Sequence, residues 1–461
     1  MENFWDYNVW GWIFLVGVLF GSLLLGNVLK KTIPFLKNSL IPTSVLCGAM
    51  LLVVAGVYKA ITGDVMFDTP IFNSCGTQYL EVITYHALAL GFIASAFKTT
   101  GEKLTKKRSQ EIFNTGVTTV STYLLQAIFG ISITMIASLI IKDFFAAAGV
   151  LLPFGYGQGT GQALNYGTIY ETQYGFTAGK SFGLTIAALG FISASIGGVI
   201  HLVIMKRKGK IINSERSDGS LHSESIDSEI EIPMQASIDK LTVQMALIVV
   251  AYIVAYLLML LLGSLLPSLK AIIYGFNFLL GVLTATLIKL LLNFFTKKKI
   301  IKKKYTNNFL MTRVSNFFFD IMIIAGVAAI RLDILENYWG IILILGVVGA
   351  VITFIYTKFV ANSLFPDYAE EQFLTMYGML TGTASTGIIL LREIDKDFNT
   401  PASDNMVYQN FPAIIFGFPM MFLATLAPKR PLLTLIIFIV FFCVLNIVLF
   451  RHKIFKPQKP R

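Results

Sequence analysis

Residues 153–167 read PFGYGQGTGQALNYG, a glycine-rich polar run inside a chain that is otherwise strongly apolar. Glycine stands at 155, 157, 159 and 161, with Tyr, Gln and Thr between these positions. A period of two does not form one face of a helix. Glycine adopts unusual backbone angles and permits close approach, which leaves amides and carbonyls free to bind a ligand. The run therefore predicts a break in helical structure with unpaired backbone groups.

The composition places this run in a membrane protein. The chain has 461 residues, of which 55% are hydrophobic and 14% charged, and its mean hydropathy is +0.71. Soluble proteins carry about 25% charged residues. The net charge of +11 lies in loops between apolar segments, so membrane topology explains it and no nucleic-acid partner is expected. Cys47, Cys75 and Cys443 have no ligand-like spacing and indicate neither a disulfide framework nor a metal site.

Apolar segments of the length needed to cross a bilayer recur along the chain. A spanning helix takes roughly 20 mostly apolar residues. The N-terminus has no basic segment before its first apolar run, so we expect that run to be a retained span rather than a signal peptide. The expected spans are 11 in number: 10–29, 40–60, 79–97, 113–141, 179–205, 241–266, 270–294, 316–332, 338–360, 406–427 and 431–450.

The distribution of Lys and Arg orients these spans. With the N-terminus outside and the C-terminus in the cytoplasm, 30 of the 37 basic residues lie on the inner side. Cytoplasmic loops are enriched in Lys and Arg, so the split favours this orientation in a cell membrane. The orientation requires that neither segment 143–170 nor segment 367–395 crosses the membrane.

Both of these segments are too short in their apolar parts to cross. The first has Phe144 to Leu152 and then the glycine-rich run; the second has Phe373 to Leu380, then TGTASTG. Irregular backbone at membrane depth is tolerated where protein buries it or a watery cavity receives it. Each segment is therefore predicted to be a re-entrant hairpin that returns to the side from which it came.

The two hairpins fall in corresponding places of two halves. A polar linker, 206–240, separates a first membrane repeat, 1–205, from a second, 241–430, and an extra span with a basic tail follows at 431–461. Landmarks recur in order: IPTSVLCG and LPSLKAIIYG, Gly91 and Gly326, GQGTG and TGTASTG. An odd number of crossings precedes the linker, so the repeats have opposite senses. The predicted fold is an all-α polytopic membrane protein with two inverted-topology five-helix repeats, each with a re-entrant hairpin, and a C-terminal eleventh helix.

The hairpin tips are the predicted binding site. The positive N-terminal end of a helix suits an anion, and free carbonyls suit a cation such as sodium. In secondary transporters, inverted repeats bring such hairpin tips together. For one isolated motif, close helix packing by small residues would be the simpler explanation. Two matched motifs favour binding. The predicted ligands are Gly157, Gln158, Gly159, Thr160, Gly161 and Asn165 in the first hairpin, and Thr381, Gly382, Thr383, Ser385, Thr386 and Gly387 in the second.

Three further polar residues are candidates for lining a path through the membrane. Asp320 lies in the first turns of an expected span, where an ionisable group is costly, although an interfacial aspartate explains it equally well. Gln409 and Asn410 precede Pro412 in another expected span. No HExxH, GxSxG or nucleotide-binding motif occurs, so neither an enzyme nor a bound cofactor is expected. The letters GYG resemble a potassium-channel filter, which leaves a channel as an alternative from another class.

The two hairpins and IPTSVLCG together resemble the sodium/glutamate symporter family over about residues 10–440. The resemblance implies sodium coupling, a dicarboxylic amino-acid substrate such as glutamate, and a homodimer in the lipid bilayer. The first loop departs from the family pattern at Gln162, Asn165 and Tyr166, and the linker and the eleventh span are further departures. A citrate-like hydroxycarboxylate or another organic anion therefore remains an alternative substrate.

Overall fold

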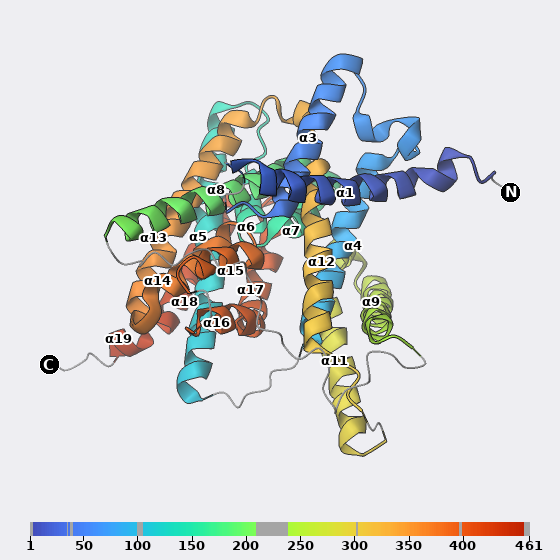
Figure 1. The fold of residues 1–461 in the computed structure, drawn as a ribbon. Coiled ribbons are helices and arrows are strands. Elements are labelled where there is room, and N and C mark those ends of the chain that lie inside the picture. Colours follow the sequence, from blue (N-terminus) through green and yellow to red (C-terminus); the bar gives the residue numbers. More distant parts are fainter. Residues whose placement is uncertain are drawn as a thin grey trace. The chain divides into compact units, whose positions relative to one another are not determined.

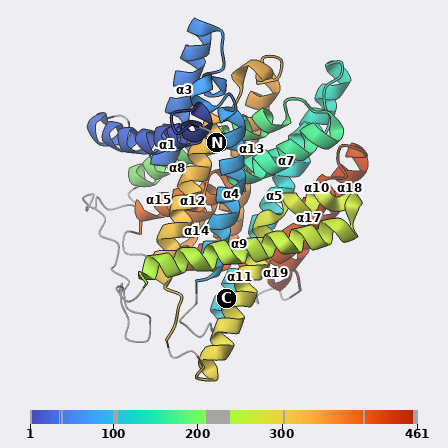
Figure 2. The same ribbon diagram turned by 90° about the vertical axis from the view of Figure 1, so that its right-hand side faces the viewer.

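A computed structural model describes residues 3–34, 36, 40–98, 105–208, 238–300, 303–395 and 399–455, and it is all-helical, with no strand in these ranges. Most of the linker 206–240 lies outside the described residues. Figures 1 and 2 trace the chain. In the described ranges, 10 helices are long and apolar enough to cross a membrane. They are α1 (Tyr7–Thr32), α3 (Thr43–Thr62), α4 (Gly76–Ala96), α5 (Lys106–Ile140), α8 (Gly179–Arg207), α9 (Lys240–Leu265), α11 (Asn277–Lys297), α12 (Asn308–Ala328), α13 (Trp339–Leu364) and α18 (Pro431–Leu449).

One expected span, 406–427, differs from the prediction. In its place stand α16 (Ala402–Tyr408) and α17 (Asn410–Ala424), which meet at an angle of 50°. Pro412 explains the break, because proline has no N–H to donate within the first turn of a continuing helix and its ring disfavours helical backbone just before it. The chain therefore has ten single spans in its described part, or eleven if this bent pair crosses as one.

The chain divides into two compact units. The first unit comprises residues 1–80, 104–211 and 324–461, and the second comprises 81–103 and 212–323. In the second unit, α9 and α11 pack with parts of α4 and α12, joined by α10 (Lys270–Gly275), around a core that includes Ile93, Ile248 and Met311. This division by compactness does not follow the linker, and the two inverted repeats stay a prediction.

Both segments that were expected not to cross form pairs of short helices in the first unit. In the first segment, η3 (Ala148–Val150) and α6 (Leu151–Tyr156) precede α7 (Gly159–Tyr174). The rings of Phe154 and Tyr166 stack with their centres 3.7 Å apart, which shows that α7 turns back along α6. We call the interruption at Gly157–Gln158 the first break.

The second segment repeats this arrangement with different residues. A turn of helix, η6 (Pro366–Tyr368), leads into α14 (Ala369–Thr381), and α15 (Ala384–Arg392) follows. A β-carbon built on Gly378 would lie 2.8 Å from Gly387 Cα, so α15 runs back against α14 in backbone contact. We call the interruption at Gly382–Thr383 the second break.

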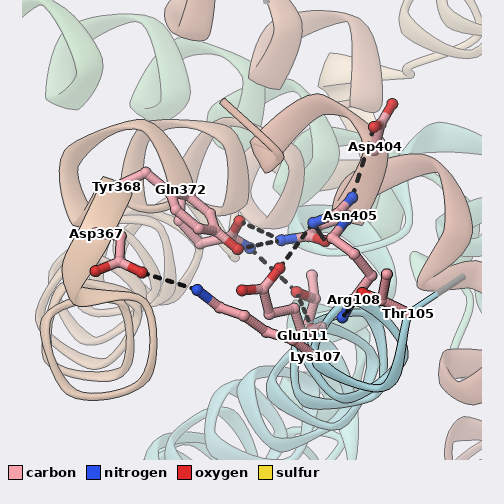
Figure 3. A network of polar contacts seen from close by, with 10 residues as sticks. Thr105, Lys107, Arg108, Glu111, Asp367, Tyr368, Gln372, Asp404 and Asn405 are labelled. Carbon is pink, nitrogen blue, oxygen red and sulfur yellow. Dashed lines mark hydrogen bonds and ion pairs between the residues drawn. The ribbon is translucent and has the colours of Figure 1, made fainter. Parts of the chain in front are cut away.

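A polar network fixes the start of this second helix pair against α5 and α16 (Figure 3). The Arg108 guanidinium donates to Glu111 at 2.8 Å and to Asn405 at 3.0 Å. Asn405 in turn donates to Tyr368 at 2.9 Å and to Gln372 at 3.1 Å. Asn405 is fully buried and Glu111 is only 9% exposed. Charged and amide side chains thus satisfy one another's hydrogen bonds, in place of water, where α5, α16 and the start of α14 meet.

We predict that Arg108→Gln destabilises the protein by about 1–3 kcal/mol, because it leaves a mostly buried carboxylate without its cation. Arg108→Gln combined with Glu111→Gln should recover most of the loss. The measurement is the melting temperature of the purified protein. Lys107→Gln is the control, since its ion pair with Asp367 has side chains 73% and 70% exposed and such pairs contribute little. Equal effects of the two single substitutions would contradict the prediction.

Candidate functional site

The first break leaves the start of α7 uncapped. Gln158 occupies the N-cap position and makes no side-chain hydrogen bond to the helix. The first N–H groups of a helix have no partner within the helix, so this end carries a partial positive charge. Gly159 has a φ of +78°, a conformation that residues with a β-carbon rarely adopt. Thr160 and Gly161 are buried directly behind it.

The second break differs because a side chain caps its second helix. Thr383 Oγ1 accepts from the amide of Thr386 at 3.2 Å, which satisfies one free donor of α15. The Thr381 hydroxyl donates to Tyr377 O at 2.7 Å, within its own helix. Thr386 is buried, Thr383 is half-buried and Ser385 is exposed. The hydroxyls predicted from the sequence therefore do not all point to one place.

Helix α5 contacts both breaks with side chains one turn apart. The Tyr123 hydroxyl donates to Gly157 O at 3.0 Å, at the first break. The Gln126 amide donates to Leu380 O at 3.0 Å, in the last turn of α14, and to Thr353 Oγ1 at 2.8 Å. Carbonyls at the end of a helix lack partners within the helix. Tyr123 and Gln126 supply donors to such carbonyls on both helix pairs.

Helix α8 lies against both breaks on another side. A β-carbon built on Gly190 would lie 2.4 Å from Thr381 O and 3.3 Å from Tyr156 Cα. One turn further along α8, Ser193 bonds to both helix pairs. The Tyr156 hydroxyl lies 2.9 Å from Ser193 Oγ, and the Tyr377 hydroxyl donates to Ser193 O at 3.0 Å. The last residues of α6 and α14 thus meet at one point of α8, which brings the two breaks together.

Several buried amide atoms near the first break and on α5 have no hydrogen-bond partner in the described part of the chain. They are Gln126 Oε1, Gln158 Nε2 and both polar atoms of Gln162, which is 1% exposed. Gln162 lies one turn before Tyr166, whose hydroxyl donates to Met421 O at 2.7 Å, so its helix face is turned toward α17. Buried polar groups are almost always paired with protein, water or a ligand. Their concentration here is the strongest structural indication of a binding site.

The remaining predicted residues separate into those near the breaks and those away from them. Asn165 is buried on α7, and Gly387 packs so closely that an added β-carbon would lie 2.5 Å from Thr375 O. Gln409 is buried and its amide lies 3.4 Å from Met379 Sδ, one turn from the second break. Asn410 is exposed. Asp320 belongs to the second unit, and its role as a path-lining residue stays a prediction.

Four residues at the breaks were not predicted from the sequence: Tyr123, Gln126, Gly190 and Ser193. The signal that could have found two of them is the polar run TTVSTYLLQ at 118–126, inside an otherwise apolar span. Polar side chains within membrane helices usually bond across helices or line a functional path. Gly190 and Ser193 carry no such signal, because their importance comes from what packs against them.

The far end of α14 is held by an ionic cluster. His201 Nε2 lies 2.8 Å from Glu370 Oε2, and the Lys358 ammonium bonds to the same carboxylate. Partial burial opposes ionisation of Glu370, but Lys358 and His201 outweigh it and lower the pKa of this carboxyl below its ordinary value. The carboxylate therefore stays charged at neutral pH and anchors the start of the helix.

The chemistry available at the breaks is that of neutral oxygens and amide donors. Within the described residues, no group of three or more His, Cys, Asp or Glu side chains could hold a metal ion. Backbone carbonyls, amide oxygens and hydroxyls are hard ligands that suit small cations without a permanent negative charge. The start of α7 carries the partial positive charge of a helix N-terminus, which suits a carboxylate. The arrangement therefore offers both kinds of ligand over a short distance.

We predict that Gly190→Val lowers the melting temperature of the purified protein, because the new β-carbon would displace backbone atoms of the second break. Overpacking of this kind costs about 1–3 kcal/mol. Gly340→Val is the matched control, since Gly340 also lies in a helix and nothing comes within 4 Å of its added β-carbon. If both valine variants melt alike, α8 does not hold the breaks as described.

Comparison with known proteins assigns the chain to a family. No curated protein matches it. The sodium/glutamate symporter family matches residues 14–398, which include both helix breaks and most of the candidate spans. With ten candidate spans in its described part, the chain is a multi-pass membrane transport protein. Because the match covers most of its 461 residues, the chain belongs to the sodium/glutamate symporter family.

Proposed function

We propose that the protein is a sodium-coupled symporter of a small anionic solute, glutamate or a related dicarboxylic amino acid. The observation that carries the proposal is the meeting of two helix breaks at Gly190 in a member of this family. Broken helices in transporters direct helix ends at substrate and coupling ions. Sodium is cargo here, and no resident cofactor is part of the proposal.

A substrate carboxylate is proposed to bind at the start of α7. Gln158 makes no side-chain cap at this helix end, and the helix dipole favours an anion there. The Gln158 and Gln162 amides lie within the first turn and a half of the same helix and lack partners in the described chain. One carboxylate could satisfy the backbone donors and an amide together.

Sodium is proposed to bind closer to the end of α14. Leu380 O and Thr381 O lie in its last turn, where carbonyls are not used by the helix and carry partial negative charge. Gln126 donates to Leu380 O, which fixes the amide so that its Oε1 points elsewhere and is available to a cation. Thr383 adds a hydroxyl oxygen beside this helix end.

The transport cycle is proposed to be alternating access around the two helix pairs, acting as re-entrant hairpins from opposite faces of the membrane. The proposal also includes two inverted repeats and a homodimer. It places the N-terminus outside the cell and the C-terminus in the cytoplasm. The distribution of basic residues supports the orientation, since 30 of 37 fall on one side of the expected topology. Family membership supports the symport of an anionic solute with sodium.

We predict that proteoliposomes containing the protein take up labelled glutamate when a sodium gradient is directed inward, and that uptake falls at least tenfold when potassium replaces sodium. The physical reason is that we expect the oxygen ligands to fit sodium better than the larger potassium ion, so that potassium would not bind and offset the charge of the substrate. Aspartate and citrate should be tested in parallel. Uptake that does not depend on sodium would contradict the proposed coupling. Preferred uptake of citrate would contradict glutamate as the substrate. A flux that does not saturate with substrate concentration would favour a channel.

We predict that Gly159→Ala reduces uptake at least tenfold, while Gly175→Ala leaves it within about twofold. Both glycines lie at ends of α7 with positive φ, +78° and +73°. An alanine at either position carries a similar backbone strain of about 1–2 kcal/mol. Only Gly159 lies at the break, so only there should strain displace the proposed binding groups. Uptake is compared at equal amounts of folded protein; equal losses would indicate general strain rather than a site.

A further inference from the structure

A cavity of about 500 Å³ lies within the first unit, between the start of α5 and the C-terminal ends of α13 and α18. Its volume falls in the range of ligand sites, roughly 300–1,000 Å³. The cavity is lined by Gln110 and Asn114 of α5, Ser363 and Leu364 of α13, and Leu449, Phe450, His452 and Lys453 at the end of α18 and the start of α19 (Arg451–Phe455).

The lining has a strong chemical bias. It contains no carboxylate, whereas Lys453 contributes a positive charge and His452 a further donor. Neither side chain forms an ion pair with a carboxylate in the described part of the chain, and both are exposed. The neutral polar members Gln110, Asn114 and Ser363 add hydrogen-bond donors. Such a combination attracts an anion with several acceptor oxygens, of which phosphate is the commonest in a membrane.

A neighbouring arginine is fixed at the edge of the cavity. Arg451 Nη1 donates to Val448 O at 2.7 Å and lies 3.4 Å from Asn114 Oδ1, and its guanidinium is 5.3 Å from the centre of the Phe113 ring. In the described chain no carboxylate neutralises it. The Tyr356 hydroxyl donates to Asn446 at 2.8 Å, which holds α18 against α13 just below. The positive charge is thus positioned by packing rather than by a counter-ion.

The location identifies the source of the anion. One candidate span, α5, begins at this point and two others, α13 and α18, end here, so we expect it to lie at the level of the lipid headgroups. The apolar side chains Leu364, Leu449 and Phe450 line the cavity beside the polar ones, so both the headgroup and the first part of an acyl chain find suitable contacts. Basic pockets at the ends of membrane helices bind anionic lipid headgroups through these same forces.

We propose that this cavity binds the phosphate of an anionic phospholipid, with Lys453 and His452 as the groups that select for negative charge. The site is separate from the two helix breaks, because its lining residues come from other turns of α5 and α13 and from α18. Bound lipid would join the ends of three helices of the first unit. A free phosphate shares the chemistry of the headgroup and differs in lacking the acyl chain.

The test is native mass spectrometry of the purified full-length protein with added phosphatidylglycerol or phosphatidylcholine. We expect selective retention of phosphatidylglycerol, reduced about fivefold or more by His452→Gln combined with Lys453→Gln, as each charge near the surface contributes roughly that factor. Lys429→Gln combined with Arg430→Gln, at the other end of α18, is the control and should retain the lipid. Lys453→Arg should also retain it.

Three results would overturn the proposal: equal retention of both lipids, equal retention by the wild type and the His452/Lys453 variant, or equal loss in the control variant. A parallel arm adds millimolar inorganic phosphate without lipid. Selective binding of free phosphate, with no binding of phosphatidylglycerol, would reject the lipid as the source. Melting temperatures of all variants are compared, so that unfolding is not mistaken for loss of the site.

Discussion

The structure depends on the requirement that every backbone polar group within a membrane must have a partner. An unbroken helix meets the requirement by itself, but a break exposes carbonyls before it and amides after it. In the described part of the chain, the first and second breaks are of this kind, and other helices supply partners at each. Tyr123 and Gln126 of α5 supply donors to carbonyls at Gly157 and Leu380, one on each helix pair. The breaks are stable because other helices satisfy them.

The glycines of the chain serve two physical purposes that the sequence does not distinguish. Several permit backbone contact between helices: an added β-carbon at Gly149 would lie 1.9 Å from Gly130 O, and one at Gly167 would lie 2.5 Å from Gly179 O. Gly159 is different, because its positive φ is required by the break itself. Close packing therefore accounts for part of the glycine-rich run, and the break accounts for the rest.

The sequence allowed the helical class, the spans and the short interrupted segments to be predicted, because hydropathy and segment length are local properties. It did not predict the 50° bend around Gln409, since a single proline near the start of a helix changes direction without changing hydropathy. It also missed Gly190, whose role comes from Thr381 and Tyr156 packing on it from distant positions. Asp320 was singled out because ionisable groups in spans are costly; it lies in the second unit, and its role stays a prediction.

The two breaks have similar helix arrangements but present different chemical groups, and this difference bears on which ligand each break would bind. Thr383 caps α15 and uses up a donor that an anion would need, whereas α7 has no cap from Gln158. The partnerless amides of Gln158 and Gln162 lie on the uncapped helix as well. At the second break, the groups near the end of α14 are oxygens: Leu380 O, which accepts from Gln126, Thr381 O, and the Thr383 hydroxyl that caps α15. This difference is the basis of our proposal that an anion binds at the first break and a cation at the second, where each ligand would lower the electrostatic cost of the other.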